Sequence, residues 1–193
     1  MDSTFINFLF QGLEISAPIA YAALGAVFSE RSGVINIALE GIMTVTTFFI
    51  VLGAMSFSNV YVGLLVAIIS GLIMAGIHAL ATVTFKIDQI VSGVAINILA
   101  MGVGRFFSQQ AYGQETQSAL NSFLPPTLFG TNIFALLLIP IAIIAWFVLY
   151  KTVFGLRLRA VGENPEAADT LGINITLMRY AGVLISGGLI GFS

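Results

Sequence analysis

Residues 41–85 form a stretch of 45 residues that contains no Asp, Glu, Lys or Arg. A helix needs about 20 apolar residues to cross the hydrocarbon core of a bilayer, so this stretch is long enough for two crossings. Of the 193 residues, 8% are charged and 58% are hydrophobic, whereas an average soluble domain has about 25% charged residues. The composition therefore excludes a soluble globular domain, a disordered chain and a nucleic-acid-binding protein.

The apolar segment 135–149 shows no alternation of apolar and polar residues, although the strands of a membrane barrel require one. We therefore predict an all-α fold, a polytopic transmembrane helix bundle with about five full spans plus a truncated sixth. The sixth is truncated because only 14 apolar residues, 180–193, remain for it. The predicted spans are 8–28, 41–56, 60–85, 89–108 and 128–150, with the sixth beginning at 179.

Small residues recur every four positions along the span 60–85, at Gly63, Ala67, Gly71, Ala75 and Ala79. Such a stripe lets the backbones of two membrane helices approach closely. A second set of small residues, in the last apolar segment, also requires a helix partner: Gly182, Ser186, Gly187 and Gly191. Both patterns predict tight helix packing.

The basic residues predict the orientation, because Lys and Arg gather on the cytoplasmic side of membrane proteins. If 151–179 is cytoplasmic, six of the seven basic residues lie inside and only Arg105 lies outside. We therefore predict a multi-pass protein of the cell (plasma or inner) membrane whose N-terminus is outside. The six inside residues are Arg31, Lys86, Lys151, Arg157, Arg159 and Arg179.

The loop 151–179 contains the signals of a short helix. Asn164 is a favourable N-cap, Pro165 suits the first helical position and Gly172 is a natural C′ residue. The predicted helix, Pro165–Leu171, also has acids in its first turns, where the helix dipole favours them.

One side of this predicted helix is apolar, with Ala167, Ala168 and Leu171 spaced three to four residues apart. A helix of this kind can insert into a groove on another protein. It can equally rest on lipid headgroups, and the residues alone leave the two alternatives open.

Two sequence motifs, GLRLRAVGENPEAADTLGIN at 155–174 and ERSGVINIALEGIM at 30–43, resemble the membrane permease family of ATP-binding-cassette importers. The similarity is to the nucleoside and simple-sugar branch, related to ribose and branched-chain amino acid permeases, and it runs over all 193 residues. It implies that 1–193 is a single permease domain with a cytoplasmic coupling loop at 151–179. Members of that family continue beyond this length, so we expect an N-terminal fragment.

The resemblance also implies partners and a docking site. The partners are a cytoplasmic ATP-binding subunit, an extracellular substrate-binding protein, a second permease subunit (homologous or identical) and the lipid bilayer; no cofactor and no nucleic acid are implied. In that family the coupling helix docks into a cleft on the ATPase subunit. The corresponding residues are Glu163, Asn164, Pro165, Glu166, Ala167, Ala168, Leu171 and Gly172.

The segment 30–41 joins the first two spans and contains a polar, glycine-containing break. Asn36 and Glu40 are four residues apart, which places them on one face if the segment is helical. The segment is then either a gate beside the translocation pathway or an ordinary solvated loop. The candidate pathway or gate residues are Glu30, Arg31, Asn36, Glu40 and Asn97.

Isolated polar residues within the spans are further candidates, because ionisable groups in membranes are often functional. For His78 we favour a hydrogen-bonded packing role, and for Asn97 a hydrogen bond across helices. Glu14 is expected near the outer interface.

Catalytic motifs are missing from the sequence. A single histidine cannot build a His-based metal site, and neither a GxSxG nor a Walker-type motif occurs. The missing motifs predict that the chain is not an enzyme and that ATP is hydrolysed by a partner. Together with this, the resemblance implies a permease subunit of an ATP-driven importer for nucleosides or simple sugars. The alternatives are an ion-gradient-driven transporter that uses Glu14, Glu40 or Asp88, and an intramembrane enzyme that pairs His78 with a serine.

Overall fold

The computed structural model describes residues 3–112, 127–128 and 131–193. Within them, five segments are long and apolar enough to cross a membrane. They are formed by α1 (Ser3–Arg31), α2 (Leu39–Phe57), α3 (Val60–Ala79) with its π-helical continuation η1 (Leu80–Thr84), α4 (Gln89–Tyr112) and α6 (Ile133–Lys151). The apolar helix α9 (Ile175–Ile190) is shorter. The predicted polytopic helix bundle is confirmed.

Two of the predicted boundaries are wrong. The fifth span begins at Ile133 rather than 128, because β1 (Thr127–Leu128) and β2 (Thr131–Asn132) form a short antiparallel pair before it. The last helix begins at Ile175 rather than 179, because the Asn174 side chain accepts a hydrogen bond from the Leu177 amide at 2.9 Å and caps it.

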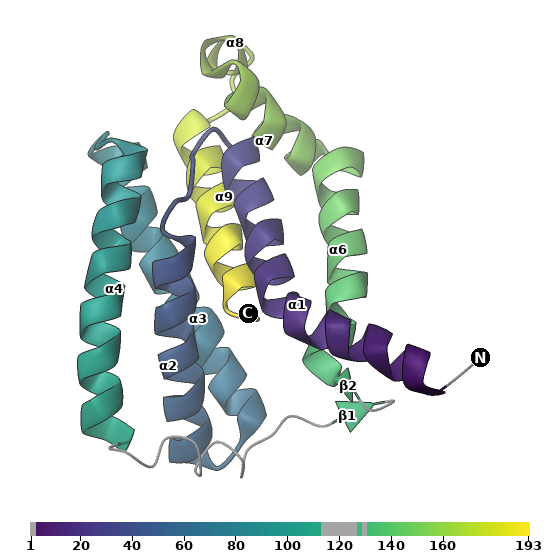
Figure 1. The fold of residues 1–193 in the computed structure, drawn as a ribbon. Coiled ribbons are helices and arrows are strands. Elements are labelled where there is room, and N and C mark those ends of the chain that lie inside the picture. Colours follow the sequence, from purple (N-terminus) through teal and green to yellow (C-terminus); the bar gives the residue numbers. More distant parts are fainter. Residues whose placement is uncertain (1–2, 113–126, 129–130) are drawn as a thin grey trace.

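The helices pack in the order α4, α2, α3, α9, α1 and α6, each against its neighbours in that series. Pro18 lies inside α1, and Figure 1 shows the first part of this helix running at an angle to the rest, as an internal proline predicts. Two short helices, α7 (Val153–Glu163) and α8 (Pro165–Thr170), lie at the end of the bundle opposite the β1–β2 pair (Figure 1).

Both small-residue patterns pack as predicted. All five stripe residues of α3 are buried. An added side chain at Gly71 would overlap the carbonyl oxygen of Gly187 on α9, and one at Gly187 would overlap the Cβ of Ala75. One at Gly63 would overlap backbone atoms of α2. Small residues on α3 thus allow α2 and α9 to approach it closely on two sides.

The α1–α2, η1–α4 and α6–α9 connections all lie at the end of the bundle where α8 lies (Figure 1). The cations that were predicted to be cytoplasmic lie in these connections or at the helix ends beside them. Arg105, the cation predicted to lie outside, is in the second half of α4. The helix directions therefore agree with the predicted topology, and which side of the membrane this end faces stays a prediction.

Candidate functional site

The short helix α8 begins as predicted. The Asn164 side-chain oxygen accepts a hydrogen bond from the Ala167 amide at 3.0 Å, and Pro165 occupies the first turn. The cap satisfies one of the amides that a helix start leaves free. Because α8 includes only Pro165–Thr170, it is one residue shorter than predicted, and Leu171 is its C-cap.

A Schellman turn ends α8. Gly172 has a φ of +76°, its amide donates to the Asp169 carbonyl at 2.8 Å, and the Ile173 amide donates to the Ala168 carbonyl at 3.1 Å. This pair of bonds is the pattern that a C′ glycine produces. The predicted stop at Gly172 is therefore confirmed.

The predicted apolar face of α8 is wrong. Ala168 is only 2% exposed and belongs to a buried cluster with Phe28 of α1 and Met178 of α9. Ala167 is exposed, and Leu171 is 77% exposed. The three residues differ in exposure because α8 ends at Thr170 and packs only one side against the rest of the chain. The exposed tip combines Leu171 with the acidic side chains of Glu163, Glu166 and Asp169.

The helix α7 precedes this tip and was predicted as loop. Thr152 caps it by accepting a hydrogen bond from the Gly155 amide at 3.1 Å, and Gly155, Leu158 and Val161 form its buried side. The signals were present in the sequence as a threonine cap and three residues with helical spacing.

The C-terminal end of α7 touches the connection between α1 and α2. A side chain at Gly162 would overlap the carbonyl oxygen of Arg31, and a Cβ at Gly33 would lie 3.2 Å from the Cα of Gly162. Gly33 also has a φ of +83°, a conformation that glycine adopts most readily. The two glycines thus bring the α7–α8 element directly against the predicted gate segment.

The gate segment is not helical over its whole length, so the prediction that Asn36 and Glu40 share a helix face is wrong. Residues 34–36 have no regular secondary structure, and α2 starts only at Leu39. Asn36 is buried; its amide donates to the Ser186 hydroxyl at 3.2 Å and its oxygen accepts from the Ala38 amide at 3.1 Å. Glu40 is exposed in the first turn of α2.

Side chains from α3 and α4 form hydrogen bonds with the backbone of this irregular segment. Asn97 donates to the Ile37 carbonyl at 3.0 Å and accepts from the Gly41 amide at 2.8 Å, which confirms its predicted role across helices. Gln89 accepts from the Ile35 amide at 2.7 Å. These side-chain partners replace the backbone hydrogen bonds that an irregular segment lacks. No sequence signal singled out Gln89.

His78 takes part in the same arrangement. Its Nδ1 lies 3.0 Å from the Ser92 hydroxyl and its Nε2 lies 3.4 Å from the Ile35 carbonyl oxygen. Both side chains are buried, and the second nitrogen faces a backbone carbonyl instead of the carboxylate of a catalytic triad. The contacts match the packing role favoured for His78.

The remaining ionisable candidates lie on the surface of the described bundle. Glu14, Glu30 and Arg31 are exposed. Asp88 is exposed and caps α4 by accepting from the amides of Ile90 and Val91 at 2.9 and 3.1 Å. In residues 3–112, 127–128 and 131–193, no group of three His, Asp or Glu side chains is placed to hold a metal ion.

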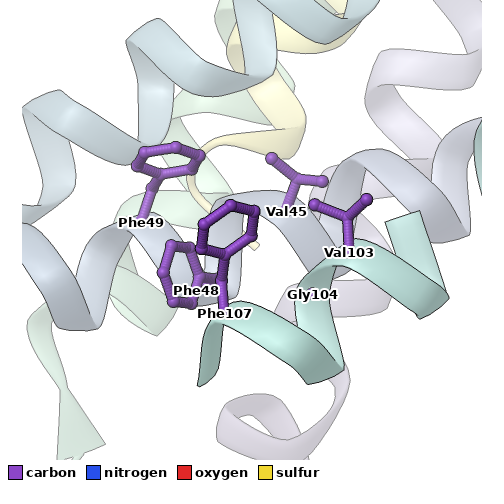
Figure 2. Close-up of a pocket in the computed structure, with 6 residues that line it drawn as sticks. All are labelled: Val45, Phe48, Phe49, Val103, Gly104 and Phe107. Atoms are coloured by element: carbon purple, nitrogen blue, oxygen red, sulfur yellow. The ribbon is translucent and has the colours of Figure 1, made fainter. Parts of the chain in front are cut away.

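An apolar pocket of about 230 Å³ lies between α2 and α4, lined by Val45, Phe48, Phe49, Val103, Gly104 and Phe107 (Figure 2). The rings of Phe48 and Phe107 are 6.3 Å apart. Its side chains offer aromatic faces but no hydrogen-bonding group, so it suits an apolar occupant. None of the residues that line it was predicted as a site residue.

Fold and composition together define a multi-pass helical membrane protein. Residues 8–193 match the model of the family described as the permease component of branched-chain amino acid transport systems, and the chain belongs to this family. No solved structure matches it significantly.

The chain is also similar to two curated relatives. The chain is 44% identical to the guanosine ABC transporter permease protein NupQ of Bacillus subtilis, over 91% of this chain and 61% of NupQ. It is 41% identical to the nucleoside ABC transporter permease protein NupC of Lactococcus lactis, over 91% of this chain and 62% of NupC. The chain thus spans about three fifths of the length of these relatives.

Proposed function

We propose that this chain is part of the membrane-spanning subunit of an ATP-driven importer for nucleosides. The similarity to two nucleoside permeases over nine tenths of the chain supports the substrate class. Because the chain spans about three fifths of their length, we propose that further spans complete the permease. We also propose that the N-terminus lies outside the cell.

The observation that carries the proposal is the exposed tip at α8. A rigidly capped helix presents a leucine that is 77% exposed at the end of the bundle. An ATPase subunit with an apolar cleft and a basic rim would complement this leucine and the three acids around it. We propose that this tip is the docking element for the cytoplasmic ATPase.

The contact between Gly162 and the α1–α2 connection supports a route for coupling, which we propose runs from α8 to this connection. Motion of α8 would pass through α7 to the α1–α2 connection. Hydrogen bonds of Asn36 and Asn97 join this connection to α9, α2 and α4. Alternating access would then change how this segment packs between the helices. A second permease subunit would complete the pathway, and an extracellular binding protein would deliver the nucleoside.

The experiment is uptake of labelled guanosine into proteoliposomes that contain the complete permease, its ATPase and its binding protein. We expect uptake to require ATP on the ATPase side and to persist when an uncoupler removes ion gradients. Uptake that ignores ATP and stops with the uncoupler would instead support the ion-gradient transporter. None of its three candidate carboxylates (Glu14, Glu40 and Asp88) is buried.

A further inference from the structure

Two apolar side chains are exposed on the outward side of α7. Val153 is 65% exposed and Leu156, one turn further on, is 60% exposed. The opposite side is already buried, through Gly155, Leu158 and Val161. Val153 and Leu156 are therefore open to contact a surface outside the described bundle.

Positive charge surrounds these two apolar residues. Between 151 and 162 the chain contains Lys151, Arg157 and Arg159 and no acidic residue. Lys151 and Arg157 are exposed. The acids begin only at Glu163, next to α8, so the segment changes from basic to acidic as it leaves the bundle.

Aromatic rings hold two of the cations beside the last turns of α6. The Lys151 Nζ lies 5.5 Å from the ring centroid of Trp146, and the Arg159 guanidinium carbon lies 4.9 Å from that of Tyr150. Trp146 and Tyr150 are themselves exposed. Exposed Trp and Tyr at the end of a membrane helix mark the headgroup level of the bilayer, so the cations lie at that level.

We propose that this α7 surface, formed by Lys151, Val153, Leu156, Arg157 and Arg159, lies in the membrane interface and binds anionic phospholipid headgroups. The apolar pair would enter the boundary of the acyl chains while the cations contact phosphates. Charge complementarity favours an anionic lipid over the partner proposed for the acidic α8 tip. The inference goes beyond the proposed function and does not depend on ATPase docking.

The first test measures depth in the membrane. The sequence contains no cysteine, so a single spin label can be attached at Leu156→Cys in the purified chain, reconstituted in vesicles with 30% phosphatidylglycerol. We expect the label to collide more with oxygen than with an aqueous nickel complex. Leu171→Cys on α8 is the matched control, exposed and apolar, and should show the reverse. The proposal is overturned if the label at 156 collides with the nickel complex as often as the label at 171 does. It is also overturned if protein shields the label at 156 from both reagents.

The second test measures how lipid binding depends on the cations of the α7 surface, and it needs no label. Binding of phosphatidylglycerol is compared with that of phosphatidylcholine by native mass spectrometry of the full chain. Each cation near a membrane surface changes affinity about fivefold, so Lys151→Gln with Arg157→Gln should weaken phosphatidylglycerol binding about 25-fold and leave phosphatidylcholine unchanged. Lys86→Gln removes an exposed cation elsewhere at the same end and should have little effect. Equal effects of the double variant and Lys86→Gln would overturn the assignment to α7.

Discussion

The α3–α9 contact and the α7–α8 element both depend on small residues, but in different ways. Between α3 and α9, glycines remove side chains so that backbones can meet over several turns. In the α7–α8 element, one buried alanine and two caps hold a short segment whose other side is exposed. The first region maintains the fold, whereas the second can change its outer surface without disturbing the core.

The largest effect is expected at Gly187. In Gly187→Leu the new side chain would overlap Ala75 and Gly71, and overpacking of this kind costs about 1–3 kcal/mol or more. We expect most of the protein to be lost from the monodisperse peak in size-exclusion chromatography. Gly188→Leu is the matched control, because a Cβ there has its nearest contact at 3.6 Å, with Leu72. If both variants behave alike, close packing of α3 and α9 does not hold the bundle together.

A more local effect is expected at Ala168, because this residue lies on α8 and outside the membrane helices. Ala168→Arg would bury an unpaired charge among Phe28 and Met178, at a cost of several kcal/mol. We expect proteolysis to cut near α8 while the membrane helices stay folded. Ala167→Arg, on the exposed side, should leave the cleavage rate unchanged. Resistance of Ala168→Arg to cleavage would mean that α8 does not pack as described.

The smallest effect is expected at the helix cap. Asn164→Ala removes the hydrogen bond to the Ala167 amide, which costs about 1 kcal/mol. Hydrogen exchange at the amides of α8 should become about fivefold faster, with exchange in α3 and α9 unchanged. No change at α8 would show that its packing, not its cap, determines its stability.

Local sequence patterns predicted those structural features that are determined by residues close together in the sequence. The number of spans, the Asn164 cap, the Gly172 stop and the stripe of α3 were predicted correctly, because hydropathy, capping and small-residue spacing act over a few turns. The face of α8 was predicted wrongly, because the burial of Ala168 depends on Phe28, which lies far away in the sequence.

The polar arrangement around the α1–α2 connection could be predicted only in part. Asn36, His78 and Asn97 were each identified as candidates, but nothing local showed that they meet at one irregular segment. Their partners come from helices up to 150 residues apart in the sequence. Gln89 was missed because a glutamine at the start of a predicted span resembles an ordinary boundary residue.

The central claim is that the α8 tip docks onto the ATPase, and Leu171 tests it most directly. Leu171→Arg keeps Ala168 buried but places a charge where an apolar side chain would enter a cleft. A loss of about 3 kcal/mol lowers the association constant more than a hundredfold, whereas a helix resting on anionic lipid would gain from an added arginine. The measurement is copurification of the ATPase with the complete permease at matched membrane levels, with Thr176→Arg, an exposed position on α9, as the control. We predict that Leu171→Arg loses the ATPase and Thr176→Arg retains it; retention by Leu171→Arg would contradict the account.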